Sequence, residues 1–253
     1  MIYIAIPAHN EAGTLGVLLW KIRKVMAEFG RDFEIVVLDD ASDDGTAEVL
    51  ARYARALPLR TVRAEQRLGY GAAVERLLRD IVDRSAYPKR DVVVTLQGDF
   101  TENPEDLVDM VKAIEGGADL VAGRVAEEGT GLPKPVRVSR RLARVLLGRA
   151  LTRAPVADPL SGFRAYRVIV VKKAVRELPE GERLLWSKGW GANLELLSKV
   201  APHARRIEEC PFRVGFAHRE RASRFRPVAG LRSLLGLRRT VWPAPAATSP
   251  PLP

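Results

Sequence analysis

Short apolar runs alternate with amphipathic segments along the first half of the chain. Strand-like runs rich in β-branched residues lie at residues 2–7, 33–39, 59–64, 91–96 and 119–123. Between them, apolar residues recur at helical spacing over residues 14–29, 46–56, 70–84 and 104–114. This alternation predicts an α/β fold with a mostly parallel sheet flanked by helices. Right-handed crossovers would bring the carboxyl ends of its strands to one edge.

Polar clusters follow four of the predicted strands, as "AHNE", "DDASDDGT", "QGD" and "GR". Ligands of open α/β sheets bind outside the carboxyl ends of the strands, so these clusters predict a ligand site. Carboxylates there, such as Asp39 and Asp40, can accept hydrogen bonds from a base or a ribose. The same stretch also suits a helix start capped by Ser42 or Thr46. This stretch alone does not decide between the two interpretations.

No glycine-rich phosphate motif accompanies these clusters. The stretch "RLGYGAAV" has neither the GxGxxG frame nor a P-loop lysine. The phosphates of a nucleotide would therefore be bound by other means. A divalent cation held by Asp99, together with arginines, would bind these phosphates.

Composition excludes several other classes of protein. The single cysteine, Cys210, excludes an intrachain disulfide framework, and the three histidines are not at the spacing of zinc ligands. No apolar run approaches the ~20 residues of a membrane-spanning helix, and the N-terminus lacks the features of a signal peptide. We therefore expect a cytoplasmic protein.

Charge is distributed unequally between the two halves of the chain. Residues 1–128 carry a net charge of −7 and residues 129–253 a net charge of +17. Residues 129–157 contain seven basic residues and no acidic one, with Val138, Leu142, Val145 and Leu146 at helical spacing. Residues 227–242 form a second basic amphipathic segment, and the proline-rich residues 243–253 are predicted to be disordered. Such helices suit an anionic membrane surface, although their leucines would equally suit packing on the core.

Six motifs together resemble those of family 2 glycosyltransferases. They are "IPAHNEAGTL", "EIVVLDDASDDGT", "GYGAAV", "QGDFTENPEDL", "AGR" and "DPLSGFRAY". The similarity covers residues 1–226 and is greatest to the dolichyl-phosphate mannosyltransferase and polyprenyl-phosphate glycosyltransferase branch. It implies a GT-A, Rossmann-like domain over residues 1–226. Residues 1–125 would bind the nucleotide sugar and residues 126–226 the acceptor.

The resemblance also implies a role for individual residues on the donor side. The residues expected to line the nucleotide pocket are Pro7, Asn10, Glu11, Asp40 and Gln97. Asp99 matches the second aspartate of the family's DxD motif and would hold Mg²⁺ or Mn²⁺. Gln97 stands where the family has the first aspartate, and Thr101 where this branch often has a glutamine. Arg124 matches an arginine near the sugar and diphosphate.

On the acceptor side, Asp158, Ser161, Gly162 and Phe163 match the family's "DxxSGF" segment. Arg219, Ser223 and Arg224 resemble a late arginine and Ser-Lys pair that closes over the diphosphate. Here arginine replaces the lysine and a glycine is missing. The basic block at residues 134–153, with Arg137 and Arg140, would offset the charge of a phosphate acceptor.

The nature of the acceptor follows from a chemical argument. An alcohol acceptor usually needs a carboxylate base to take its proton, whereas a phosphate is already ionised. The second half of the chain has no adjacent Glu-Asp pair. Glu195 is the nearest candidate base, and a solvated helix position explains it as well. The sequence therefore favours a lipid phosphate.

The expected protein is an inverting, metal-dependent glycosyltransferase. It would move mannose or glucose from GDP-mannose or UDP-glucose to a polyprenyl or dolichyl phosphate, as a peripheral protein at the cytosolic membrane face. Alternatives are the same fold with a soluble acceptor and a degenerate nucleotide-sugar-binding protein. Nucleic-acid binding is disfavoured because the basic residues are not interleaved with aromatics. A membrane-anchoring partner or a homo-oligomer stays open.

Overall fold

The computed structural model describes residues 1–125 and 153–212, with six positions between them, at residues 138, 142, 145, 147, 148 and 151. Several predictions therefore lie outside the described residues. They are the roles of Arg137, Arg140, Arg219, Ser223 and Arg224, the basic segment at residues 227–242 and the tail at residues 243–253.

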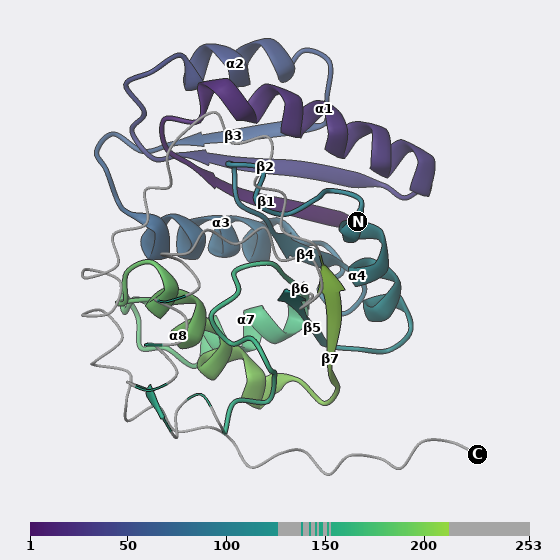
Figure 1. Cartoon of the computed structure of the whole chain (residues 1–253), viewed down its shortest axis with the longest axis vertical. Coiled ribbons are helices and arrows are strands. Elements are labelled where there is room, and N and C mark those ends of the chain that lie inside the picture. Colours follow the sequence, from purple (N-terminus) through teal and green to yellow (C-terminus); the bar gives the residue numbers. More distant parts are fainter. Residues whose placement is uncertain are drawn as a thin grey trace.

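One seven-stranded sheet organises the molecule, with the strand order β3-β2-β1-β4-β6-β5-β7 (Figure 1). The strands are β1 (Ile2–Ala8), β2 (Phe33–Asp39), β3 (Leu59–Arg63), β4 (Val92–Thr95), β5 (Leu120–Val125), β6 (Arg164–Arg167) and β7 (Ile207–Phe212). The helices are α1 (Ala12–Phe29), α2 (Thr46–Tyr53), α3 (Tyr70–Arg84), α4 (Asp106–Glu115), α7 (Val168–Arg176) and α8 (Trp190–Val200), with a short 3₁₀ turn η1 (Ala201–His203). The predicted alternation of strands and helices up to residue 123 is confirmed.

The sheet is parallel except for β6, which runs antiparallel between β4 and β5. The register places Ala8 of β1 opposite Asp39 of β2, and Ala5 opposite Thr95 of β4. The segments that follow β1, β2 and β4 therefore leave the sheet at the same edge. Because β6 is antiparallel, the chain enters it from this edge, where Arg164 lies opposite Thr95.

Helices cover both faces of the sheet. On one face, Ile4 and Ile6 of β1 pack in a cluster with apolar residues of α1 and α4. On the other, Tyr3 and Ala5 pack in a cluster with residues of α3, α7 and α8. Figure 1 shows α1 and α2 together on one side of β1 and β2, and α3 on the opposite side. Burial on both faces explains why the central strands are continuous apolar runs.

Candidate active site

The end of β1 interlocks with the loop between β2 and α2. The Asn10 backbone N–H donates to Ser42 Oγ at 2.9 Å, and the Glu11 N–H donates to Thr46 Oγ1 at 2.9 Å. The Asp43 N–H in turn donates to Asn10 Oδ1 at 2.9 Å. The hydroxyls of Ser42 and Thr46 thus satisfy backbone donors just before α1, and α2 has no side-chain cap. These contacts fix Asn10 and Glu11 at the carboxyl edge.

Asp40 connects this edge to the loop before α3. Its carboxylate is almost fully buried and accepts hydrogen bonds from the Leu68 N–H at 2.6 Å and the Gly69 N–H at 2.9 Å. A carboxylate has further acceptor capacity beyond two such bonds. Asp40 can therefore still accept a hydrogen bond from a nucleotide, and that contact stays a prediction. The observed contacts hold the loop at residues 66–69 beside β2.

Gly98 brings the end of β4 against β1. The Thr14 hydroxyl donates to the Gly98 carbonyl oxygen at 3.0 Å. A Cβ atom added at Gly98 would lie 3.5 Å from Glu11 Cγ and 3.6 Å from the Pro7 carbonyl oxygen. Pro7, Glu11 and residues 97–99, which come from distant parts of the sequence, are therefore neighbours.

Asp99 is fixed by a local turn. Its Oδ1 accepts the Thr101 N–H at 3.1 Å and also the Thr101 hydroxyl, and Phe100 between them has a φ of 61°. Asp99 is half-buried, and carboxylate oxygen is a donor that Mg²⁺ and Mn²⁺ prefer. The described residues contain no group of three or more His, Cys, Asp or Glu side chains able to hold a metal ion. The donor set therefore fits a cation that takes most of its ligands from a bound diphosphate and from water.

Glu102 is a site residue that no sequence motif identifies. Only 2% of it is exposed, and its two oxygens accept the Gln97 N–H at 3.1 Å and the Gln97 Nε2–H at 2.8 Å. Burial, and secondarily the charge of Asp99, raises the pKa of the Glu102 carboxyl to about 7. Because the Gln97 amide nitrogen is bound to Glu102, its carbonyl oxygen is the acceptor that this side chain offers a ligand. The sequence "TENPED" reads as a helix start, which conceals this role.

The "DPLSGF" segment forms framework contacts at the same edge. The Gly162 carbonyl oxygen accepts the Thr95 hydroxyl at 2.6 Å, and a Cβ atom at Gly162 would lie 2.5 Å from the Tyr70 hydroxyl oxygen. Phe163 is fully buried, with its ring centroid 5.2 Å from that of Phe212. Ser161 Oγ accepts the Phe163 N–H at 3.3 Å. Gly162 and Phe163 therefore shape the site by packing.

Glu209 is a neighbour of Arg124 and lines a cavity together with Asp158. Arg124 Nε is 3.8 Å from Glu209 Oε2, and the other oxygen of Glu209 accepts the Ala157 N–H at 2.5 Å. Asp158 lines a cavity of about 730 Å³ with residues 151, 154–157, 159, 160, 207 and 209. The Arg124 side chain is 43% exposed, so it is accessible to a ligand. Glu209, which no sequence motif identifies, partly offsets the charge of Arg124.

Glu195 is not the solvated helix position that the sequence allowed. It is buried on α8, and its Oε2 accepts the N–H groups of Trp186 at 3.0 Å and Ser187 at 2.8 Å. Two charge-assisted bonds to backbone donors give this carboxylate a structural role, which disfavours it as a general base.

No helix among the described residues is long and apolar enough to cross a membrane.

The family model for glycosyl transferase family 2 matches residues 3–174. A dolichyl-phosphate hexose transferase of Haloferax volcanii is 32% identical over 234 residues, which are 90% of this chain and 87% of that protein. A dolichol-phosphate mannosyltransferase of Pyrococcus furiosus is 28% identical over 220 residues, 85% of this chain and 57% of that protein. The chain thus spans little more than half of the Pyrococcus relative.

Solved structures share the arrangement of the sheet and its helices. Glucosyl-3-phosphoglycerate synthase from Mycobacterium tuberculosis, in complex with Mn²⁺, UDP and phosphoglyceric acid, superposes with a TM-score of 0.65 at 25% identity. The match covers 96% of this chain and 80% of that one. The Staphylococcus aureus TarS fragment in complex with UDP gives a TM-score of 0.57 at 18% identity, covering 94% of this chain and 64% of that one. The chain is a family 2 glycosyltransferase with the GT-A fold.

Proposed function

We propose that this chain transfers a hexose, mannose or glucose, from GDP-mannose or UDP-glucose to a polyprenyl phosphate, with inversion, at the cytosolic face of a membrane. The names of the Haloferax and Pyrococcus relatives support a dolichyl-phosphate acceptor. The structural role of Glu195 is the observation that favours a phosphate as the acceptor. Its carboxylate is bound to backbone N–H groups, and a phosphate acceptor needs no such base.

In the proposed reaction, an oxygen of the acceptor phosphate forms a bond to the anomeric carbon. The bond from that carbon to the diphosphate breaks on the opposite side, and its electron pair leaves with the nucleoside diphosphate. Arg124 would stabilise the negative charge that develops on the leaving group. Mg²⁺ or Mn²⁺, when bound at Asp99, would supply further positive charge at the diphosphate. Arg219 is proposed for the same role from outside the described residues.

The donor side is assigned to residues at the ends of β1, β2 and β4. Pro7, Asn10, Glu11 and Asp40 would surround the base and ribose. Gln97, with its amide nitrogen held by Glu102, would present its carbonyl oxygen to a ribose hydroxyl or a metal-bound water. A neutral side chain here leaves Asp99 as the carboxylate nearest the diphosphate in this motif. We therefore expect weak metal binding to the free protein and tighter binding with nucleotide.

A soluble phosphorylated acceptor is the second candidate. The Mycobacterium tuberculosis enzyme with this fold was crystallised with phosphoglyceric acid. The cavity of about 730 Å³ beside Asp158 has room for a small acceptor of that kind. Both candidates use the same donor site, so only the acceptor distinguishes them.

The Asp99→Ala substitution tests the proposal. The assay follows a labelled sugar from the nucleoside diphosphate to a short polyprenyl phosphate in detergent with Mn²⁺. We expect the variant to lose about 100-fold or more in rate, as for other preorganised groups that stabilise charge in a transition state. Asp83→Ala, at an exposed position of α3, is the matched control and should leave the rate unchanged. Transfer by Asp99→Ala at the wild-type rate would overturn the assignment.

A further inference from the structure

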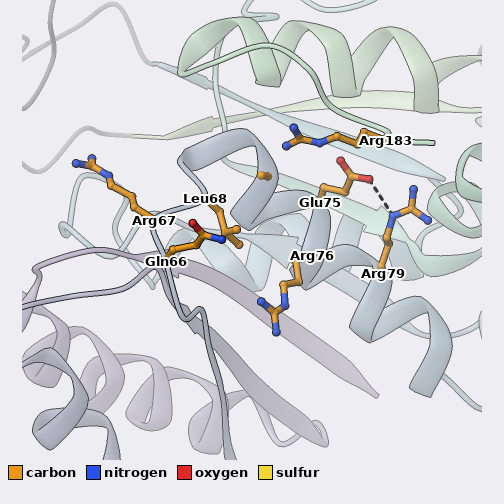
Figure 2. Close-up of a pocket in the computed structure, with 8 residues that line it drawn as sticks. Gln66, Arg67, Leu68, Glu75, Arg76, Arg79 and Arg183 are labelled. Atoms are coloured by element: carbon orange, nitrogen blue, oxygen red, sulfur yellow. Dashed lines mark hydrogen bonds and ion pairs between the residues drawn. The ribbon is translucent and has the colours of Figure 1, made fainter. Parts of the chain in front are cut away.

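A pocket lined with arginines lies on the outer side of α3 (Figure 2). Its volume is about 460 Å³. Arg67 comes from the loop before α3, Arg76 and Arg79 from α3 itself, and Arg183 from the loop between α7 and α8. The one carboxylate in its lining is Glu75. Four arginine side chains therefore line one opening.

The positive charge of this pocket is largely uncompensated. Glu75 Oε1 accepts the Arg79 Nε–H at 2.9 Å and the Leu184 N–H at 2.8 Å, and Oε2 accepts the Leu185 N–H at 3.0 Å. Within the described ranges, Arg67, Arg76 and Arg183 form no ion pair with a carboxylate. Guanidinium groups bind phosphate oxygens through paired N–H donors, so the pocket fits a phosphate group.

An exposed tryptophan adjoins the arginines. Trp186 is 65% exposed, and the guanidinium of Arg183 lies 5.3 Å from the centroid of its ring. Successive backbone N–H groups of residues 184–187 are bound by Glu75 and Glu195, and Leu184 and Leu185 are buried. The indole is thus presented by an anchored loop. Tryptophan with an apolar body and a polar N–H favours the interface between a bilayer and water.

The pocket is joined to the candidate active site. Asp40 binds the N–H groups of Leu68 and Gly69 in the loop that lines the pocket. A Cβ atom at Gly71 would lie 2.5 Å from the Ser187 carbonyl oxygen, so the start of α3 packs directly on the loop of Trp186. A surface bound to this face would lie beside the carboxyl edge of the sheet.

We propose that the arginine pocket and Trp186 form a docking surface for an anionic membrane. The arginines bind the phosphate of a lipid headgroup, and the indole lies in the interfacial layer. The choice of a membrane rests on the proposed function, since a polyprenyl phosphate acceptor is held in a bilayer. The residues of this surface come from α3, the loop before it and the loop after α7, and none of them belongs to the basic segments that the sequence predicts at residues 129–157 and 227–242.

Binding of the full chain to sedimented vesicles tests the proposal without any polyprenyl phosphate present. The vesicles contain either phosphatidylcholine alone or phosphatidylcholine and phosphatidylglycerol in roughly equal amounts. Each basic residue near an anionic surface contributes about fivefold to binding, so the R76E/R183E variant should bind the anionic vesicles about 25-fold more weakly or worse. Trp186→Ala should weaken binding to both kinds of vesicle.

Matched controls lie across the sheet. Arg23 on α1 and Arg52 on α2 are exposed, and R23E/R52E changes the net charge by the same amount. Trp20 on α1 is 53% exposed, so Trp20→Ala removes an equally large aromatic group. Both controls should bind anionic vesicles within about twofold of wild type, because the attraction falls off within a Debye length of the surface.

Four results would overturn the proposal. The first is wild-type vesicle binding by R76E/R183E, and the second is an equal loss in R23E/R52E. The third is loss of UDP or GDP binding in R76E/R183E, which would assign the arginines to the nucleotide. The fourth is release from vesicles by millimolar inorganic phosphate at matched ionic strength, which would indicate a free-anion site. The transfer assay in detergent is independent, so its failure alone would refute the proposed function and leave the docking surface standing.

Discussion

Glu102→Gln removes the charge of a buried carboxyl while keeping its shape. The wild-type carboxylate accepts two hydrogen bonds from Gln97, one from the backbone N–H and one from the side-chain amide. Glutamine offers one acceptor oxygen and turns an NH₂ group toward the other donor. Losing one charge-assisted bond would cost about 1.5–3 kcal/mol, offset in part because no charge remains buried.

The pH dependence of stability gives a more specific prediction for Glu102→Gln. Burial and the charge of Asp99 raise the pKa of Glu102 to about 7, above the ordinary value of 4.5 that the unfolded chain would have. The contribution of this group is therefore complete below about pH 4.5 and is lost as the pH rises through about 7. Between about pH 5 and pH 8.5 the wild type should lose about 2–3 kcal/mol from this one group. The glutamine variant should lack that decrease.

Urea unfolding of the metal-free protein at those two pH values measures the effect. The decrease in unfolding free energy should be about 2–3 kcal/mol smaller in Glu102→Gln than in wild type. Glu28→Gln, at an exposed position of α1, should leave the wild-type pH dependence unchanged. An identical pH dependence in wild type and Glu102→Gln would refute the reasoning about the buried carboxyl.

Three further predictions concern two residues that pack around the site and the binding of metal to it. Glu195→Ala leaves two backbone N–H groups without their acceptor and should lower the unfolding free energy by about 2–4 kcal/mol, with proteolysis increased at residues 184–187; unchanged protection there would contradict this. Gly162→Ala should be destabilised because its Cβ meets the Tyr70 hydroxyl, and Tyr70→Phe should restore part of the thermal midpoint; no rescue would refute that contact as the cause. Calorimetry should show Mn²⁺ binding that is weak alone and at least about tenfold tighter with UDP or GDP, whereas tight binding alone would require a further protein ligand.

Most elements of the first half could be predicted because the central strands β1, β2 and β4 are largely buried on both faces. Val92 to Leu96 form an unbroken buried run, apolar except for Thr95, and its end marks the sheet edge where Gln97 and Asp99 lie. The strand β6 could not be placed in the same way. It enters the sheet between β4 and β5 from a distant part of the sequence, and its Arg164 is fully buried. The partners of that guanidinium are the carbonyl oxygens of Asn193 and Pro159, which no sequence pattern identifies.

The candidate site likewise combines residues that the sequence predicts with residues that it does not. Motif positions at the ends of β1 and β4 were predicted, and the structure brings Pro7, Glu11 and residues 97–99 together. The structural roles of Glu75, Glu102 and Glu195 were not predicted, because each carboxylate is buried and binds backbone N–H groups of a loop. A glutamate on a helix, such as Glu75 or Glu195, is ordinarily solvent-exposed, and only tertiary packing reveals such a role.

The central claim is transfer of a sugar to a lipid phosphate. The most direct measurement incubates the purified chain and Mn²⁺ with labelled GDP-mannose or UDP-glucose, a short polyprenyl phosphate and phosphoglyceric acid together. We predict label in an organic-soluble glycosyl phosphate lipid, formed by wild type and Asp83→Ala and lost in Asp99→Ala. Label found only in the water-soluble acceptor, or a lipid product that Asp99→Ala forms at the wild-type rate, would contradict the account.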